Sequence, residues 1–402
     1  MLRGGLLVVI ATCTALAAAR QSPQADSIQE LLKNVDTRYS NDIFEDARLD
    51  VPDLIRKYRY PVEVHTVTTE DGYILEMHRI PHGRDANNVP NQRKPVVFIM
   101  HGLLTSSADF VIMGPGKGLA YILAEEGFDV WLGNARGNSY SRKHVSLNPD
   151  ALLSTAFWKF SWDEIGNIDL PTMIDYALEV SGEQRLHYVG HSQGTTAFFV
   201  FGAMRPEYNA KIISMHAMAP VAYMANNRSL LLRMLAPFSN NIEGIASVIG
   251  IGEFLPSRTI YSWAGQALCH DETTLPIIMG HAPAGAAVRQ FAHYGQGISG
   301  GDFRRFDQGT RLRNYRTYGS FNPPRYDLSK ITIPVFLHYS DSDPLAHVND
   351  VDRLFRDLGR PMGKFRVPMS SFSHIDFIYG ISAKELVYDR VINLIKAMDA
   401  NA

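Results

Sequence analysis

The hydrophobic residues of this chain follow a period of two near the N-terminus and short unbroken runs further on. Residues 64–68 and 73–80 alternate in hydrophobicity on either side of Asp71-Gly72. A D-G step between two alternating runs is typical of a β-hairpin. The stretch 95–100 is instead continuously apolar, which predicts a strand that is buried on both faces.

Predicted strands and helices alternate along much of the rest of the chain. Further strands are predicted at 128–132, 185–189, 211–218, 333–339 and 365–367. Helices are predicted at 118–126, 163–180, from 194 onward, 348–358 and 383–398. Such alternation favours the α/β class, with a mostly parallel central sheet and helices on both of its faces.

The alternation is interrupted between residues 220 and 314. This stretch is rich in Leu, Met, Ile and Gly and has no alternating strand pattern, which predicts a helical cap or lid inserted into the fold. The α/β core would then consist of two parts, 51–219 and 315–402, on either side of the insertion 220–314.

The first 50 residues have a different character. Arg3 precedes an apolar stretch that ends in small residues, so residues 1–19 are predicted to be a secretory signal peptide. A membrane anchor is the alternative, but about 14 apolar residues fall short of the roughly 20 that span a bilayer. Residues 20–50 are polar and mixed, and we expect a loosely ordered N-terminal extension. The expected destination is extracellular, with the lysosome as the alternative.

The composition of the 402 residues excludes some classes of function. A net charge of −2 and the lack of a dense basic run argue against nucleic acid as a partner. Cys13 would leave with the signal peptide, so Cys269 has no partner for an internal disulfide. The sequon at Asn227 is a candidate glycosylation site.

The segment Gly190-His191-Ser192-Gln193-Gly194 matches the G-x-S-x-G pattern. Its surroundings carry more weight than the pattern, because an apolar strand leads into it and an apolar helix follows it. This is the strand–turn–helix context of a nucleophile elbow in the α/β-hydrolase fold. We therefore expect Ser192 to be a catalytic nucleophile, and an ordinary turn serine is the alternative.

A serine nucleophile requires a base and an acid that orients the base. In the α/β-hydrolase fold the chain order is Ser, then acid, then His. Asp341 and Asp343 both follow the strand 333–339, and the pattern leaves them as alternatives. His374 follows the last predicted strand, so we expect it to be the base.

Two backbone N–H groups are expected to stabilise the oxyanion. One is that of Gln193, directly after the nucleophile, and the other is that of Leu103, in the loop after the strand 95–100. His101 lies in the same loop, but no partner stands at metal-ligand spacing. We therefore expect no metal and no cofactor.

Taken together, these motifs resemble the acid lipase family, which includes gastric and lysosomal acid lipases. The resemblance extends from about residue 50 to the end, and its motifs lie at 60–61, 70–75, 101–104, 129–138, 186–196, 281–285, 326–328 and 373–377. It implies Ser192, Asp343 and His374 as the catalytic residues, with Asp343 preferred over Asp341 because of the following Pro344-Leu345-Ala346. It also implies Leu103 and Gln193 as oxyanion donors.

The resemblance further implies hydrolysis of triacylglycerols or cholesteryl esters at a lipid–water interface, without a cofactor. An acyl channel would be lined by Met224, Leu230, Leu231, Leu232, Leu235 and Phe238. The chain departs from the family after Cys269, where the cap is shorter and the second cysteine is missing. Three alternatives follow, namely a catalytically inactive lipid-binding relative, an esterase for smaller soluble esters, and a peptidase or thioesterase with the same residues.

Overall fold

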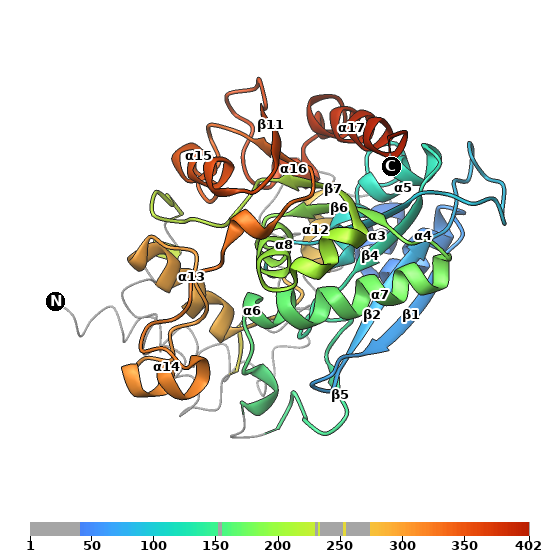
Figure 1. Cartoon of the computed structure of the whole chain (residues 1–402). Coiled ribbons are helices and arrows are strands. Elements are labelled where there is room, and N and C mark those ends of the chain that lie inside the picture. The colour runs from blue at the N-terminus through green and yellow to red at the C-terminus, as the bar shows by residue number, and fades with distance from the viewer. Residues whose placement is uncertain (1–40, 152–154, 230–231, 234–251, 255–273, 402) are drawn as a thin grey trace.

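The computed structural model describes residues 41–151, 155–229, 232–233, 252–254 and 274–401, and a mixed β-sheet forms its centre (Figure 1). Among these residues the sheet has nine strands in the order β1-β2-β4-β3-β6-β7-β10-β11, with β5 beside β2. The strands are β1 (Glu63–Thr68), β2 (Tyr73–Ile80), β3 (Val96–Met100), β4 (Asp129–Gly133), β5 (Lys143–His144), β6 (Leu186–His191), β7 (Ile212–Met218), β10 (Val335–Tyr339) and β11 (Pro361–Arg366). The pairs from β4 to β11 are parallel, whereas β1–β2 and β2–β4 are antiparallel. The predicted hairpin and the mostly parallel sheet are both confirmed.

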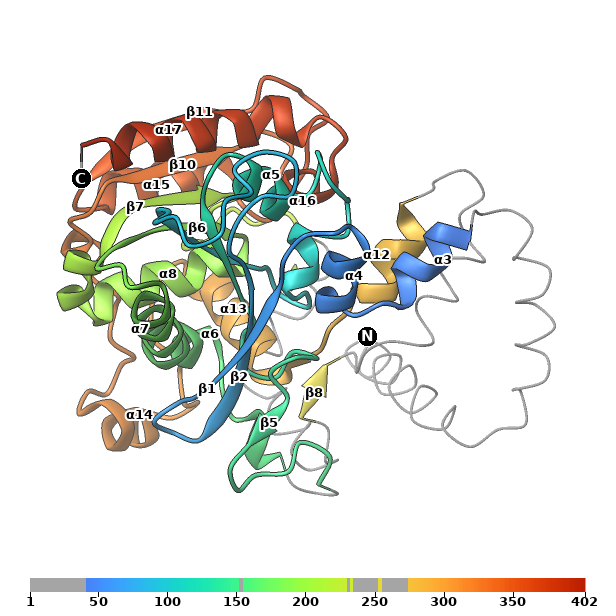
Figure 2. The ribbon, with the colours of Figure 1, turned by 90° about the vertical axis from the view of Figure 1, so that its right-hand side faces the viewer.

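Helices cover both faces of the sheet, as expected. The helices α7 (Leu170–Ser181) and α8 (Gln193–Met204) lie on one face, and α5 (Leu119–Glu125) and α17 (Asp389–Asp399) lie on the other (Figure 2). The strands β3, β4, β6 and β10 are consequently buried at every residue. This burial explains why β3 is continuously apolar and why β4, β6 and β10 show no alternation of apolar and polar residues.

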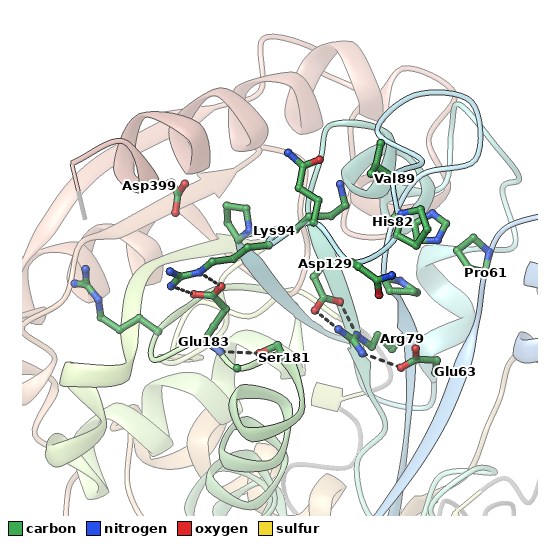
Figure 3. Close-up of a pocket in the computed structure, with 18 of the residues that line it drawn as sticks. Pro61, Glu63, Arg79, His82, Val89, Lys94, Asp129, Ser181, Glu183 and Asp399 are labelled. Atoms are coloured by element: carbon green, nitrogen blue, oxygen red, sulfur yellow. Dashed lines mark hydrogen bonds and ion pairs between the residues drawn. The ribbon is translucent and has the colours of Figure 1, made fainter.

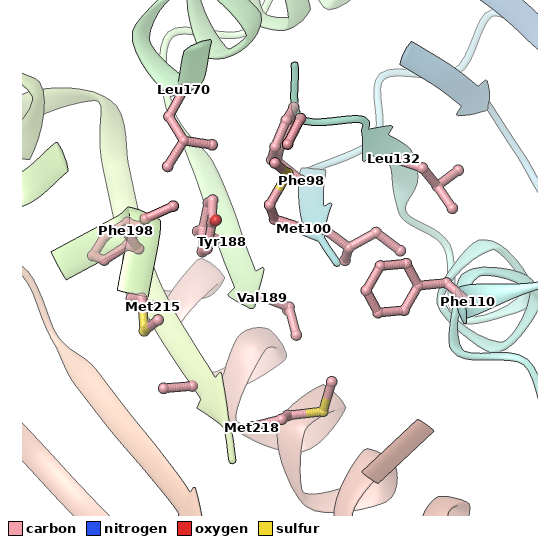
Figure 4. Packing of buried hydrophobic residues seen from close by; sticks show 14 of the residues in the cluster. Phe98, Met100, Phe110, Leu132, Leu170, Tyr188, Val189, Phe198, Met215 and Met218 are labelled. Carbon is pink, nitrogen blue, oxygen red and sulfur yellow. The ribbon is translucent and has the colours of Figure 1, made fainter. Parts of the chain in front are cut away.

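Large apolar side chains pack around the central strands. Tyr188 of β6 stacks on Phe98 of β3, with ring centroids 5.9 Å apart, and contacts Phe198 of α8 at 4.6 Å (Figure 4). Full burial of one such side chain is worth about 1.5–3 kcal/mol relative to its exposure. This packing fixes the carboxyl ends of the strands, where the predicted site residues are expected.

Two predicted helices contain an unpredicted π-helical segment. The helix expected at 163–180 consists of α6 (Trp162–Glu164), a π-helical segment (Ile165–Asp169) and α7. The closing helix has a π-helical segment (Lys384–Tyr388) before α17. A Cβ on Gly166 would lie 2.5 Å from the carbonyl oxygen of Ala197, so the first segment packs closely against α8. Hydrophobic periodicity does not distinguish such a local widening from a regular helix.

The expectation of loose order up to residue 50 is wrong for the described residues 41–50. They include α3 (Asn41–Arg48), which is followed by α4 (Val51–Lys57). The helix α3 lies against α12 (Leu275–His281) (Figure 2). A Cβ on Gly280 would lie 2.2 Å from the carbonyl oxygen of Ala47, and His281 Nε2 lies 2.8 Å from the carbonyl oxygen of Asp46. The polar composition conceals this helix because its partner is far away in the sequence.

The described part of the predicted insertion contains helices, but they make up less than half of its described residues. It contains α12, α13 (Val288–Gly300) and the start of α14 (Arg311–Tyr318). It also contains two short antiparallel strands that the sequence did not predict, β8 (Glu253–Phe254) and β9 (Ala286–Ala287). The boundaries 220 and 314 of the cap stay a prediction.

The remaining elements are two α-helices and four 3₁₀ helices. They are α15 (Val348–Asp357), α16 (Asp376–Tyr379) and the 3₁₀ helices Ser107–Phe110, Ala156–Trp158, Pro206–Lys211 and Leu328–Lys330. The strand β11 begins at Pro361, earlier than the predicted 365–367. None of the described helices is long and apolar enough to cross a membrane. The predicted signal peptide, Cys269 and the proposed channel residues Leu230, Leu231, Leu235 and Phe238 lie outside the described residues.

Candidate active site

Ser192 occupies a sharp turn between β6 and α8. Its backbone has φ 51° and ψ −116°, a conformation that non-glycine residues rarely adopt. Such strain costs about 1–3 kcal/mol and persists where the surrounding structure enforces it. A Cβ on Gly190 would lie 2.8 Å from the backbone of Gly194, and one on Gly194 would lie 2.3 Å from the carbonyl oxygen of Met100. The two glycines therefore permit the tight contact between strand and helix that the turn requires.

The structure brings Ser192, His374 and Asp343 together at the carboxyl edge of the sheet. Nε2 of His374 lies 2.7 Å from Oγ of Ser192, and Nδ1 lies 2.8 Å from Oδ2 of Asp343. These residues follow β6, β11 and β10, whose carboxyl ends meet at this edge. With Asp343 as acceptor, Nδ1 carries the hydrogen and Nε2 is free to accept the proton of the serine hydroxyl.

Asp343 is buried, with only 2% of its surface exposed. Burial by itself raises the pKa of its carboxyl group, whereas the electrostatic interaction and the hydrogen bond with His374 lower it. The N–H groups of Leu345 and Ala346 also donate to Oδ1, each at 2.8 Å, and help to hold the pKa of Asp343 below its ordinary value. Asp343 is therefore ionised at neutral pH.

Asp341, the alternative acid, is turned away from His374. Its Oδ2 lies 2.8 Å from Nε of Arg366, and both side chains are about half exposed. The sequence pattern left both aspartates open, whereas the structure places Asp343 beside the imidazole.

The loop with the predicted oxyanion donor Leu103 lies directly against the nucleophile. A Cβ on Gly102 would lie 3.3 Å from Cβ of Ser192 and 3.3 Å from Nδ1 of His191. Gln193, the other predicted donor, is the first residue of α8 and directly follows the nucleophile. The two predicted donors thus belong to segments that adjoin Ser192, and their role stays a prediction.

His101 takes part in this loop through both of its ring nitrogens. Nδ1 lies 2.7 Å from the carbonyl oxygen of Gly102, and Nε2 accepts a hydrogen bond of 3.1 Å from the N–H of Ala135. Its nitrogens are therefore engaged in holding the loop, which is a structural role and not that of a metal ligand.

A cavity of about 240 Å³ opens beside Ser192 and His374. Its wall includes Met224 and Leu232, two of the residues expected to line an acyl channel. The other apolar side chains of the wall are Leu103, Leu104, Val221, Phe291, Leu345, Ile375 and Ile378. The cavity can accept an apolar group next to the nucleophile.

Two further residues support the site without having been predicted. The side chain of His191 is buried, and its Nε2 donates to the carbonyl oxygen of His374 at 3.0 Å. Burial, together with the nearby charge of His374, lowers the pKa of His191 to about 3, so its ring is neutral. The carbonyl oxygen of Pro344, beside Asp343, accepts hydrogen bonds from the N–H groups of Arg228 and Ser229. His191 could have been found from its place in the pentapeptide, whereas the 228–344 contact has no sequence signal.

The predicted glycan on Asn227 disagrees with the structure. Asn227 is only 3% exposed, and its amide nitrogen donates to the carbonyl oxygen of Leu345 at 3.3 Å. A glycan would require this nitrogen to face solvent. The sequon therefore lies in a turn that supports the loop after Asp343.

A larger groove of about 1130 Å³ lies at the opposite, amino edge of the sheet (Figure 3). Arg79 there pairs with Asp129 and Glu63, and Arg93 pairs with Glu183. Ser192 and His374 line the smaller cavity, and neither they nor Asp343 line this groove. The volume of a cavity therefore does not identify the candidate active site in this molecule.

An α/β sheet with a strained serine after a central strand, hydrogen-bonded to a histidine and through it to an aspartate, defines the α/β-hydrolase class. Family models described as "Partial alpha/beta-hydrolase lipase region" and "alpha/beta hydrolase fold" match residues 51–114 and 95–249. The solved structure titled "The structure of DcsB complex with its substrate analogue" has a TM-score of 0.50 at 14% identity and covers 85% of this chain and 100% of that chain. This likeness supports the fold alone.

Several curated proteins are similar over most of their length. "Lipase 1" of Drosophila melanogaster is 42% identical over 88% of this chain and 81% of that protein. "Gastric triacylglycerol lipase" of Bos taurus is 35% identical over 87% and 91%, and "Lysosomal acid lipase/cholesteryl ester hydrolase" of Homo sapiens is 34% identical over 87% and 92%. The chain belongs to the acid lipase family of α/β hydrolases, and the resemblance found in the sequence is confirmed.

Proposed function

We propose that this protein hydrolyses ester bonds of neutral lipids, namely triacylglycerols or cholesteryl esters, through an acyl-enzyme on Ser192. The observation that carries the proposal is the chain of two hydrogen bonds, 2.7 Å from Ser192 to His374 and 2.8 Å from His374 to Asp343. A serine hydroxyl is a weak nucleophile, and a neutral imidazole within hydrogen-bonding distance makes it reactive.

In the first half of the reaction His374 acts as general base. Its Nε2 accepts the hydroxyl proton while Oγ of Ser192 attacks the ester carbonyl carbon. The buried carboxylate of Asp343 stabilises the imidazolium that forms. His374 then gives the proton to the leaving alcohol, and the acyl group stays on Ser192.

The second half repeats these steps with water in place of serine. His374 takes a proton from the water, the hydroxide attacks the acyl-enzyme, and the fatty acid leaves as Oγ of Ser192 is protonated again. The N–H groups of Leu103 and Gln193 would hold the oxyanion of both tetrahedral intermediates. One such donor is worth about 3 kcal/mol of transition-state stabilisation in comparable enzymes.

The substrate class is supported by the cavity and by the relatives. Its apolar wall, with Met224, Leu232 and Phe291, favours an acyl chain over a charged or peptide-like group. The names of two relatives give triacylglycerol and cholesteryl ester as their substrates. These observations favour a lipase over the alternatives of a peptidase or thioesterase.

An inactive lipid-binding relative remains the main alternative from another class. A binding protein would gain nothing from a strained Ser192 with a base 2.7 Å away. Backbone strain persists only where the surrounding structure enforces it, so the strain at Ser192 favours a catalytic role. An esterase for smaller soluble esters would follow from the shortened cap that the sequence predicts after Cys269. The esterase alternative differs from the proposal in its substrate and not in its mechanism.

We also propose that the enzyme works at a lipid–water interface outside the cytosol. Three exposed apolar side chains, Met369, Ile375 and Ile381, lie in the segment that contains His374. Ile375 also lines the cavity, so at least one of these exposed apolar side chains adjoins the site. The signal peptide predicted for residues 1–19 supports secretion, with delivery to the lysosome as the alternative.

A hydrolysis screen tests this function. Triolein, cholesteryl oleate and p-nitrophenyl esters of increasing chain length are assayed with the wild type and with Ser192→Ala. We expect turnover of the long-chain lipids by the wild type and a loss of at least 10⁴-fold in Ser192→Ala. Turnover of only short soluble esters would favour the esterase alternative, and no turnover of any ester would favour the binding protein.

A further inference from the structure

The peptide group between Gly102 and Leu103 is fixed from its carbonyl side. Its oxygen lies 2.7 Å from Nδ1 of His101 and 3.1 Å from Oγ1 of Thr105. The C=O and N–H bonds of a trans peptide point in opposite directions in one plane. Two donors on the oxygen of Gly102 therefore set the direction of the N–H of Leu103.

The first of these donors has a defined tautomer. Because Nε2 of His101 accepts from the N–H of Ala135, its hydrogen must be on Nδ1, which donates to Gly102. Burial lowers the pKa of His101 to about 4 and keeps the ring neutral. This donor does not change over the pH range in which most esterases work.

The second donor is shared with a carboxylate. The hydroxyl group of Thr105 has one hydrogen but two acceptors, namely Oδ2 of Asp109 at 2.6 Å and the carbonyl oxygen of Gly102 at 3.1 Å. The other oxygen of Asp109 accepts a hydrogen bond of 2.5 Å from the hydroxyl group of Tyr379. Tyr379 ends α16, the helix that begins two residues after His374.

Asp109 thus joins the two loops that contain the reacting groups. It stands in the 3₁₀ helix Ser107–Phe110, is buried, and lines the cavity beside Ser192. One carboxylate oxygen holds the loop of Leu103 through Thr105, and the other holds the helix after His374 through Tyr379. We propose that Asp109 is a positioning residue that sets the distance between the oxyanion donor Leu103 and the base His374. This inference rests on the proposed function, because it assigns a role to the oxyanion loop.

The surroundings of Asp109 contain hydroxyl groups and no cationic hydrogen-bond partner within the described part of the chain. Thr105 faces it from the oxyanion loop, Tyr379 from α16 and Tyr388 from the π-helical segment before α17. Burial raises the pKa of Asp109 to about 6, against the hydrogen bonds of Thr105, Tyr379 and the backbone of Gly102, which lower it. Burial also raises the pKa values of Tyr379 and Tyr388, so both phenols stay neutral.

Protonation would change what Asp109 can hold. An ionised carboxylate accepts from both hydroxyl groups, whereas a protonated one must donate through one oxygen. One of the two links then reverses or breaks as pH falls through about 6. The positioning role therefore predicts that the protonation of Asp109 adds one proton to the acid limb of the kcat profile.

The test compares Asp109→Asn and Thr105→Val with matched controls. Asp175→Asn removes a carboxylate that also accepts from a tyrosine, Tyr208, but on the surface. Thr172→Val removes a hydroxyl group that donates to a helix carbonyl. We measure kcat and KM on a p-nitrophenyl ester from pH 4.5 to 9, together with inhibition by octylboronic acid. This boronic acid forms a tetrahedral adduct with a nucleophilic serine. Melting temperatures are recorded for every variant.

In Asp109→Asn and Thr105→Val we expect kcat at pH 8 to fall about tenfold with KM within twofold, and boronate affinity to fall by a similar factor. The slope of log kcat on the acid limb should drop from near 2 to 1 in both variants, while both controls keep the wild-type slope. A wild-type slope of 1, or an unchanged kcat and slope in both variants, would overturn the inference even if their melting temperatures fell. Absence of turnover in the wild type, or its persistence in Ser192→Ala, would instead overturn the proposed function.

Discussion

The carboxylate of Asp343 holds the imidazole of His374 on the side away from Ser192, with 2.8 Å between Oδ2 and Nδ1. The neighbouring Asp341 forms an ion pair with Arg366. Two aspartates that are equivalent by sequence position therefore have different surroundings. One is buried and receives three hydrogen bonds, and the other is half exposed.

Replacement of each aspartate by asparagine should separate these roles. We expect Asp343→Asn to lower kcat about 10⁴-fold, as loss of the orienting acid does in another serine hydrolase, because an amide no longer fixes the tautomer of His374. Asp341→Asn should keep kcat within twofold. Steady-state kinetics on a p-nitrophenyl ester at pH 8 measures both. Equal losses in the two variants would show that Asp343 has no special role.

Arg136 should be among the most important residues for stability. Its buried guanidinium lies 2.6 Å from Asp169 and 2.6 Å from Asp71, and Asp169 is fully buried. Arg136→Met would leave the charge of Asp169 without its partner, so the free energy of unfolding should fall by about 3–5 kcal/mol. Urea titration measures this, with Lys211→Met as the surface control, since its pair with Asp175 is solvent-exposed. A change in Arg136→Met no larger than in the control would contradict this role.

Acid stability should depend on His338 of β10. This ring is buried between His216 and Phe365, and neither of its nitrogens has a hydrogen-bond partner among the described residues. Burial lowers the pKa of His338 to about 3, whereas a histidine in an unfolded chain titrates near 6.5. The unfolded state then binds the extra proton below about pH 6.5, so stability is lost as pH falls from 6.5 toward 3.

His338→Phe should remove this dependence. Phenylalanine keeps the stacking but takes up no proton, so the variant should avoid a loss of about 2–3 kcal/mol between pH 7.5 and pH 4.5. Free energies of unfolding at the two pH values give the difference. If wild type and variant lose the same stability on acidification, the buried ring is not the cause.

Binding to lipid surfaces should depend on Ile381. This side chain is 79% exposed and lies in the same segment as His374 and Ile375. Ile381→Asp places a charge where an apolar contact with lipid is proposed, and we expect hydrolysis of emulsified triolein to fall about tenfold while a soluble ester is turned over within twofold of wild type. Val145→Asp, which changes a similarly exposed residue near β5, is the control. Equal triolein activities of the two variants would exclude this surface as the contact.

Much of the fold is encoded in local patterns. The buried strands are rich in apolar residues without alternation because helices cover both faces, and the hairpin has its D-G turn, so both were predictable. The helix α3 was missed because the contact of its residue Ala47 with Gly280 of α12 joins distant parts of the sequence. The π-helical segment with Asp169 was missed because its hydrogen bonds differ from those of an α-helix while its apolar spacing does not.

The candidate site shows the same division. Ser192 and His374 were predictable because a nucleophile elbow and a loop after the last strand have fixed positions in an α/β hydrolase. Asp109 was not, since its importance lies in the two hydroxyl groups that reach it from residues 105 and 379. The sequon at Asn227 misled because a tripeptide contains no information on burial.

Covalent labelling of the nucleophile is the sharpest test of the proposed chemistry. The wild type, Ser192→Ala and His374→Ala are incubated with a fluorophosphonate probe at pH 8, and the labelled peptide is identified by mass spectrometry. We expect the wild type to carry one label on Ser192, and both variants to remain unlabelled over the same time. A folded wild-type protein that stays unlabelled, or a label that forms equally fast without His374, would contradict acyl-enzyme catalysis by this serine and histidine.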